Sequence, residues 1–157
     1  MKKLLLLILL LGFDILPGLT QTRKKDKAKP TGPVQLLIRC DDVGMCHSVN
    51  MATEQLIKTG LPISASVMFA CPWYQEAVEI LKQHPDVAVG IHLTLGSEWK
   101  NYRWGPISGA KEVPTLVDKN GLFWPTPGDL LKNNPSVAEI EQEFRAQIER
   151  ALNSGMG

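Results

Sequence analysis

The chain has 157 residues, of which 44% are hydrophobic, and a formal net charge of +1 at pH 7. This apolar content is typical of a globular domain of ordinary size and excludes a chain that is disordered throughout. From residue 34 onward, ten Lys and Arg stand against fourteen Asp and Glu, a net charge of −4. The acidic balance argues against nucleic acid as a partner, because nucleic-acid binding depends on positive charge.

The first residues have the pattern of a secretory signal peptide. A basic start precedes an apolar run over 4–13, and a cleavage region lies near Thr20. The run is shorter than the ~20 apolar residues of a membrane-crossing helix, and Asp14 and Pro17 interrupt it. We predict a signal peptide over 1–20, export to the periplasm or the cell exterior, and no stable membrane span after cleavage. An uncleaved membrane anchor is the alternative.

A basic segment separates this region from the rest of the chain. Residues 21–33 include five basic residues and no large apolar one, so the segment is predicted to be a solvated, disordered linker. The folded domain is expected over 34–157.

From residue 34 onward, the sequence alternates between short apolar runs and segments with helical periodicity. This βαβαβ order predicts parallel strands covered by helices. The expected elements are strands over 34–39, 63–70 and 86–95, a helix that Ser48 caps and Gly60 ends, a helix over 73–84, and a C-terminal helix over 136–153.

The C-terminal helix has the clearest sequence signals. Ser136 and Glu139 have the spacing of a capping box, and Gly155 is a natural end. The apolar positions recur at helical spacing and predict a stripe that faces the core. They are Val137, Ile140, Phe144, Ile148 and Leu152.

Between the third strand and this helix, residues 96–135 are rich in Gly, Pro, Trp and Asn and have no clear periodicity. A segment of this length is usually functional or disordered, and its aromatic residues argue against disorder. They either form a platform on which sugar rings stack or close the top of the core. These residues are Trp99, Tyr102, Trp104, Phe123 and Trp124.

The three cysteines, Cys40, Cys46 and Cys71, form no CxxC motif and are too few for a disulfide framework. We interpret them as small hydrophobic residues. A single disulfide, with Cys40 and Cys46 nearest in sequence, is the alternative in an oxidising compartment.

Two adjacent carboxylates, Asp41 and Asp42, follow the first apolar run, and Gly44 allows a sharp turn after them. Loops converge on one cavity at the carboxyl ends of parallel strands. There, one carboxylate could ligate a cation while the other accepts a proton from a bound water. The alternative is that one Asp caps the next helix and the other is solvated.

His92 lies in an apolar alternating run, at a position where a core would prefer a hydrophobic residue. Neutral imidazole commonly joins carboxylates around a divalent metal, although a lone His on a strand can also be a hydrogen-bonded core residue. Asp and His at the ends of two strands of one sheet predict a metal site with an incomplete ligand set.

Four segments together resemble the YdjC-like carbohydrate deacetylases of the ChbG/HpnK type: RCDDVGMCHSVN, ISASVMFACPWYQEAV, VAVGIHLTLG and PSVAEIEQEFRAQIERALNSG. The match runs in order over 34–157, and its most specific parts are DDxG-x(4)-VN and GIHLTL. The resemblance implies an α/β fold with a (β/α) barrel-like, deformed TIM-type arrangement. It further implies a hydrolase that removes acetyl groups from N-acetylated oligosaccharides with Mg²⁺ or Zn²⁺. By position, Asp41 would be the general base, and Asp42 and His92 would ligate the metal.

The chain also departs from this family. Its members usually have, beyond the helix that resembles 136–153, a strand with a motif like THLDSHxH that supplies another metal-binding histidine. This chain ends at Gly157, and about 124 residues follow the linker, whereas an eight-stranded barrel typically needs 200 or more. Neither His47 nor His84 is a convincing replacement. We therefore expect the N-terminal part of a deacetylase domain, with inactivity of the truncated chain as one expectation.

Two other functions stay open. A metal-dependent phosphoesterase would also use Asp and His, but no phosphate-binding glycine loop or arginine clamp surrounds the carboxylate pair. A non-catalytic exported glycan-binding module would keep the aromatic segment and would not need Asp41 and Asp42. The natural sugar, the metal and the oligomeric state are not determined by the sequence.

Overall fold

The computed structural model describes residues 32, 33 and 35–156. The predicted signal peptide over 1–20 and nearly all of the predicted linker over 21–33 lie outside the described residues. Within the described part of the chain, no helix is both long and apolar enough to cross a membrane.

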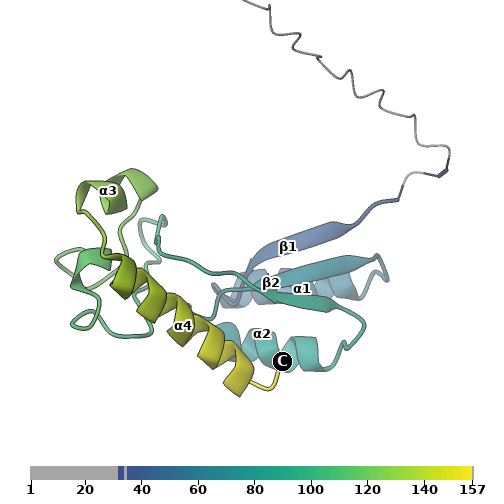
Figure 1. The fold of residues 1–157 in the computed structure, drawn as a ribbon. Coiled ribbons are helices and arrows are strands. Elements are labelled where there is room, and N and C mark those ends of the chain that lie inside the picture. Colours follow the sequence, from purple (N-terminus) through teal and green to yellow (C-terminus); the bar gives the residue numbers. More distant parts are fainter. Residues whose placement is uncertain (1–31, 34, 157) are drawn as a thin grey trace, which may run out of the picture. The chain divides into compact units, whose positions relative to one another are not determined.

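A three-stranded parallel sheet in the order β1-β2-β3 forms the centre of the domain (Figure 1). The strands are β1 (Ile38–Val43), β2 (Ile63–Val67) and β3 (Ala88–Ile91). The α/β class with parallel strands is therefore confirmed.

The bounds of all three strands differ from the prediction. β1 begins at Ile38 and includes both carboxylates, because its pairing with β2 runs from Ile38 opposite Ile63 to Val43 opposite Val67. β2 ends at Val67, three residues earlier than predicted. β3 ends at Ile91, so His92 follows the strand instead of lying inside it.

Helix α1 (His47–Ile57) follows β1, and helix α2 (Tyr74–Lys82) follows β2. The predicted cap at Ser48 is wrong: Cys46 is the N-cap, and the Ser48 hydroxyl lies 3.2 Å from its sulfur. The amphipathic pattern of α2 is confirmed, because its apolar side chains are buried in the main core. This core contains side chains of both helices and of the sheet and includes Val43, Ile57, Ile63, Val67, Phe69, Ala77, Val78 and Leu81.

The segment between β3 and the last helix is organised around a second core. It contains a short 3₁₀ helix, η1 (Pro114–Leu116), and helix α3 (Pro127–Lys132). Trp104 and Phe123 are buried there, whereas Trp99 and Tyr102 are 51% and 39% exposed. The aromatic residues therefore divide between the two predicted roles: some close a core, and others are available at the surface.

All three cysteines are free, so the alternative of a Cys40–Cys46 disulfide is not seen. Cys71 is fully buried in the second core, as the interpretation as a small hydrophobic residue requires. Burial raises the pKa of its thiol to about 12, which makes this cysteine unreactive at neutral pH.

The last helix, α4 (Val137–Asn153), runs back from the α3 region towards α2 (Figure 1). The predicted cap at Ser136 is confirmed, because its hydroxyl accepts a hydrogen bond from the Glu139 amide. The reciprocal half of the capping box is not formed, because the Glu139 carboxylate accepts from Thr115 and the Ser136 amide donates to the Thr115 hydroxyl. The predicted buried stripe is wrong: Val137 is 79% exposed and Leu152 is 59% exposed. The buried residues of α4 are instead Glu143, Gln147 and Ala151.

The polar face of α4 is buried, instead of the apolar face, because of the irregular segment that the helix covers. Apart from two isolated bridges, Gly96 with Trp124 and Val117 with Phe123, the segment forms no strand pairing, and its buried amides require other acceptors. The Glu143 carboxylate accepts hydrogen bonds from the amides of Ile107 (3.1 Å) and Ser108 (2.9 Å). Gln147 accepts from the Thr94 amide (3.1 Å) and donates to the Thr94 carbonyl (2.8 Å). The polar face of α4 therefore turns inward.

Replacement of Glu143 by Ala should destabilise the domain by about 3 kcal/mol, because two backbone amides lose their acceptor in a buried place. The matched control is Glu141→Ala, which removes an exposed pair with Arg145 on the same helix and should cost less than about 0.5 kcal/mol. Urea unfolding of the parent protein and of the two variants measures both losses of stability. Equal losses in the two variants would contradict the role assigned to Glu143.

Candidate functional site

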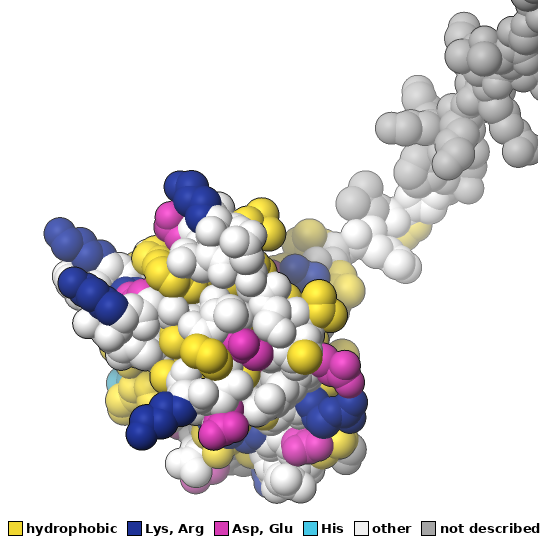
Figure 2. All heavy atoms as spheres, turned by 60° about the vertical axis from the view of Figure 1, so that its left-hand side comes forward, with side chains coloured by type: hydrophobic (Ala, Val, Ile, Leu, Met, Phe, Trp, Pro, Cys, Tyr) yellow, Lys and Arg dark blue, Asp and Glu magenta, His cyan; other side chains and the backbone are white. Residues whose placement is uncertain are grey.

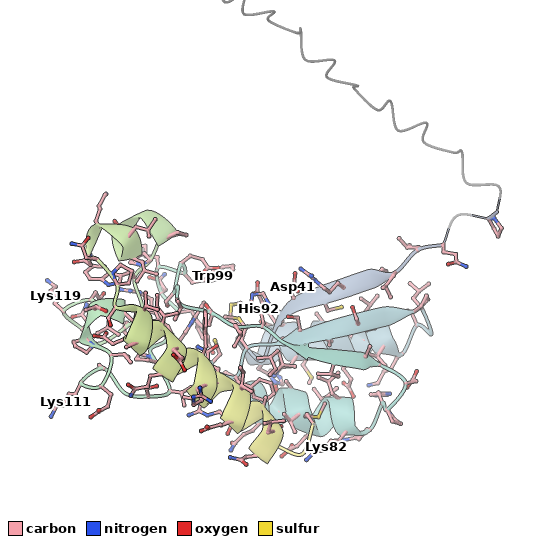
Figure 3. The ribbon with its side chains drawn as sticks, in the orientation of Figure 1. Asp41, Lys82, His92, Trp99, Lys111 and Lys119 are labelled. Carbon is pink, nitrogen blue, oxygen red and sulfur yellow. The ribbon has the colours of Figure 1, made fainter. Side chains whose placement is uncertain are left out.

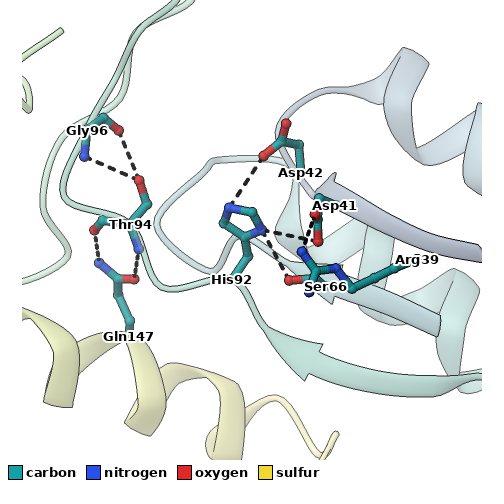
Figure 4. A network of polar contacts seen from close by, with 8 residues as sticks. All are labelled: Arg39, Asp41, Asp42, Ser66, His92, Thr94, Gly96 and Gln147. Atoms are coloured by element: carbon teal, nitrogen blue, oxygen red, sulfur yellow. Dashed lines mark hydrogen bonds and ion pairs between the residues drawn. The ribbon is translucent and has the colours of Figure 1, made fainter. Parts of the chain in front are cut away.

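The carboxylates and the histidine singled out by the sequence meet at the carboxyl edge of the sheet (Figure 3, Figure 4). Oδ1 of Asp42 lies 3.6 Å from Nε2 of His92, and Oδ1 of Asp41 lies 3.8 Å from Nδ1 of the same ring. All three side chains are partly exposed. The structure therefore brings together the residues that the sequence predicted to converge, at a place open to a ligand.

The end of β1 is distorted so that both carboxylates reach one site. Neighbouring residues of a regular strand point to opposite faces, but the β1–β2 register shifts between Cys40 and Val43. Within this irregularity Asp42 has φ = +61°, a left-handed conformation that Asp adopts more readily than most residues. This local distortion turns Asp42 towards His92.

A buried side chain holds the turn that follows. Gly44 has φ = +90°, and a Cβ at this position would lie 3.0 Å from Cα of Tyr74, so only glycine fits. The Gly44 amide donates to Oδ1 of Asn50 (2.8 Å), which is fully buried in α1. Nδ2 of Asn50 donates in turn to the Trp73 carbonyl (3.1 Å) and to Glu76 (2.7 Å). Asn50 thereby ties the distorted strand end to α2.

The imidazole of His92 is oriented from two sides. Its backbone amide continues the β2–β3 pairing through a hydrogen bond to the Val67 carbonyl (2.8 Å), and its Nδ1 lies 3.1 Å from the Ser66 hydroxyl. Nε2 is thereby directed towards Asp42. Two residues further on, Gln147 of α4 holds Thr94, so the loop that carries His92 is anchored at both ends (Figure 4).

One carboxylate oxygen of Asp41 is paired with Arg39, and the other faces His92. The Arg39 guanidinium donates to its Oδ2 at 2.7 Å, and this hydrogen bond lowers the pKa of the Asp41 carboxyl. The group is therefore ionised at neutral pH. Because Arg39 is itself highly exposed, the ion pair adds little to stability, and Oδ1 of Asp41 stays on the His92 side.

The comparison with known proteins adds to this geometry. A family model described as "YdjC-like protein" matches residues 35–157, which is most of the chain. The chain belongs to the YdjC-like family. Among the similar proteins is the carbohydrate deacetylase of Brevibacillus brevis, 34% identical over 125 residues that make up 78% of this chain and 46% of that protein. A carbohydrate deacetylase of Oceanobacillus iheyensis is 35% identical over 120 residues, or 76% of this chain and 48% of that protein.

A solved structure supports the same assignment. It is that of an Enterococcus faecalis protein described as a candidate cellobiose-phosphate cleavage protein, with a TM-score of 0.67 and 30% identity over 78% of this chain and 46% of that one. This YdjC-like chain thus spans about half the length of the curated relatives and of the solved structure that it matches.

The spacing of Asp42 and His92 can be compared with that of two ligands of one metal ion. Two ligands about 2.1 Å from one cation lie roughly 3 to 3.5 Å apart, and the 3.6 Å between Asp42 Oδ1 and His92 Nε2 is close to this separation. The hydrogen bond of Ser66 to the other ring nitrogen is typical of a ligating histidine. Across the described residues, no group of three or more His, Cys, Asp or Glu is placed to hold a metal ion. The Asp42–His92 pair therefore has the spacing of two ligands of a larger set.

Sequence reasoning missed the residues that support the site. Ser66 is one of two serines in β2, and its register partner in β3 is Gly90. Asn50 was noted only as the end of the DDxG-x(4)-VN pattern. His47, which the sequence did not favour as a metal ligand, donates a hydrogen bond from Nδ1 to the Glu76 carboxylate (2.7 Å) on α2.

Glu76 provides a test of this support. Burial raises the pKa of its carboxyl, but hydrogen bonds from Asn50 and His47 outweigh burial, and the pKa lies below its ordinary value. A carboxyl with a lowered pKa in the folded state stabilises the fold while it is ionised, and this contribution disappears as the pH falls through the folded-state pKa.

We expect Glu76→Gln to lower the stability at pH 7 by about 1 kcal/mol and to flatten the loss of stability between about pH 5 and pH 3. Denaturant unfolding at a series of pH values measures both effects. Glu79→Gln, an exposed position of the same helix, is the control and should follow the parent protein. A variant at Glu76 with an unchanged pH profile would show that the carboxylate does not support the turn.

Proposed function

We propose that the chain is the metal-binding part of a carbohydrate deacetylase that removes acetyl groups from N-acetylated sugars. The observation that carries the proposal is the meeting of Asp41, Asp42 and His92 at the carboxyl edge of the sheet. The names of the curated relatives support the reaction class. Since the chain spans about half of their length, the activity belongs to the completed domain, which we propose to be barrel-like.

In this proposal Asp42 and His92 hold the cation, and Asp41 is the general base. A divalent cation such as Mg²⁺ or Zn²⁺ would supply an activated water and polarise the acetyl carbonyl when bound there. Oδ1 of Asp41 is free of Arg39, ionised at neutral pH, and so able to accept a proton. Ser66 fixes the His92 ring so that Nε2 stays available to the cation. Attack of water on the amide carbonyl and cleavage of the C–N bond would then yield acetate and a free amine.

The exposed aromatic residues support a sugar substrate. Figure 3 shows Trp99 on the same side of the ribbon as Asp41 and His92, and its indole is 51% exposed. An exposed aromatic ring offers a flat apolar face on which a pyranose ring can stack. We propose that Trp99 takes this role for an N-acetylated oligosaccharide. Export of the chain, with a signal peptide over 1–20, stays a prediction.

The catalytic assignment is tested in a fusion of this chain to the part of the Brevibacillus brevis deacetylase that follows the matched region. Asp41→Asn should reduce acetate release from acetylated chitooligosaccharides at least 100-fold, while sugar binding persists. Asp86→Asn, an exposed position just before β3, is the control and should keep full activity. If the parent fusion folds and binds sugar but releases no acetate with Mg²⁺ or Zn²⁺, the glycan-binding alternative replaces the proposal. Release of phosphate from sugar phosphates would instead favour a phosphoesterase.

The ligand assignment is tested in the same fusion without substrate. Calorimetric titration with Zn²⁺ should show at least ten-fold weaker binding for His92→Gln than for the parent protein, because a metal ligand is lost. The control is His84→Gln, which removes a histidine at the end of α2. Equal Zn²⁺ affinity in the parent protein and both variants would show that His92 is not a metal ligand.

A further inference from the structure

Trp124 lies at a hollow on the segment between β3 and α4. The hollow has a volume of about 400 Å³, within the range of roughly 300 to 1,000 Å³ in which small-molecule sites fall. It shares no residue with the Asp–His site at the carboxyl edge of the sheet. Its walls are Asp118, Lys119, Trp124, Pro125 and Asp129, and we call it the Trp124 hollow.

Hydrogen bonds within the segment fix the walls of the Trp124 hollow. The indole Nε1 of Trp124 donates to the Thr115 carbonyl (3.3 Å), and the Trp124 carbonyl accepts from the Ser97 amide (3.0 Å). On the opposite wall, Asp118 begins a turn, because its carbonyl accepts from the Gly121 amide (2.9 Å). The ring and the turn are therefore held in place before a ligand binds, which lowers the entropy cost of binding.

One carboxylate of the hollow has an oxygen to which no described residue donates a hydrogen bond. Oδ2 of Asp129 accepts from the Thr126 hydroxyl (2.7 Å), whereas Oδ1 lies 3.8 Å from Nζ of Lys132, beyond hydrogen-bond distance. The Lys132 side chain is 80% exposed, so this ion pair is weak. Oδ1 of Asp129 is available to accept from a hydroxyl group of a ligand.

The charges at the Trp124 hollow are balanced. Asp118 is paired with Arg103, whose guanidinium donates to its Oδ2 at 2.7 Å, and Asp129 has Lys132 nearby. An anionic ligand would meet the Asp129 carboxylate, and a cationic ligand would meet the ammonium group of Lys119. The hollow therefore favours a neutral ligand.

A sugar ring fits both the apolar and the polar walls. Trp124 and Pro125 are half-buried and offer apolar surface to the flat side of a pyranose. Asp129 accepts from the hydroxyl groups of such a ring, and Lys119 donates to them. In Figure 2 the side of the molecule that carries α3 is turned forward, and hydrophobic side chains there lie between acidic and basic ones.

We propose that the Trp124 hollow binds one pyranose unit of a neutral oligosaccharide, separately from the unit that stacks on Trp99. The isolated bridge between Gly96 and Trp124 joins the stretch that carries Trp99 to the wall of the hollow. That this oligosaccharide is a substrate rests on the proposed function. The binding of a sugar in the hollow depends only on the walls described above.

The test is oxidative footprinting of the 157-residue chain, with triacetylchitotriose as the probe. Hydroxyl radicals oxidise accessible tryptophans, and mass spectrometry gives the oxidation rate of each one with and without the sugar. Millimolar sugar should slow the oxidation of Trp124. Trp73, which is 40% exposed at the start of α2, is the internal control and should be oxidised at the same rate in both samples.

Two variants identify the acceptor. Asp129→Ala should raise the sugar concentration that protects Trp124 about ten-fold, because a carboxylate hydrogen bond is lost. Asp129→Asn keeps an acceptor oxygen and should retain most of the protection. Asp86→Asn, an exposed position just before β3, is the matched control and should behave like the parent chain. The footprint of the parent chain needs no variant, so a variant that fails to fold leaves the test decisive.

Three results would overturn the assignment. The first is protection of Trp99 with no change at Trp124, and the second is no protection at either tryptophan. The third is protection of Trp124 by glucosamine oligomers alone, lost when salt is added, which would indicate a site for a cation. Acetate release by the fusion is a separate readout: its absence would end the deacetylase proposal and leave the footprint at Trp124 unchanged.

Discussion

The hydrogen bond from the Gly44 amide to the buried side chain of Asn50 is the contact on which the candidate site depends. It fixes a turn at Gly44, where only glycine fits, two residues after Asp42, which has a left-handed conformation. Two neighbouring carboxylates repel each other and would point apart on a regular strand. They share one edge because α1 and α2, joined through Asn50, hold the distorted strand end in place. The strain is thus local, and its support comes from elements distant in sequence.

A second constraint connects the site to α4. The segment that follows His92 leaves the sheet and pairs only at isolated bridges, so its backbone needs acceptors and donors from elsewhere. Gln147 and Glu143 supply them from the inner face of α4. The same helix therefore positions the His92 loop with one face and leaves its apolar face for another part of the fold. In this way one helix both supports the site and exposes an apolar face.

Sequence reasoning reached the α/β class with parallel strands, the βαβαβ order of elements along the chain, the Ser136 cap and the convergence of Asp41 with His92. The barrel-like arrangement stays a prediction. The confirmed predictions succeed because they depend on local periodicity and on a general property of parallel sheets, whose carboxyl ends lie at one edge. Sequence reasoning failed at the Ser48 cap and at the buried face of α4. Apolar periodicity identifies the face of a helix that needs a partner, but it does not say whether that partner lies within the described chain.

By itself, the sequence determined which chemical groups are present and which strand ends carry them, and its motifs indicated the family. Only the tertiary structure decided that Asp42 turns towards His92, that Ser66 orients the imidazole, and that Asn50 holds the turn. These depend on a register shift and on contacts between residues distant in sequence, such as Asp42 with His92, Ser66 with His92, and Asn50 with Glu76. Such contacts produce no periodic pattern in the sequence. The local sequence around a single polar residue is the same whether or not that residue has a hydrogen-bond partner elsewhere in the fold.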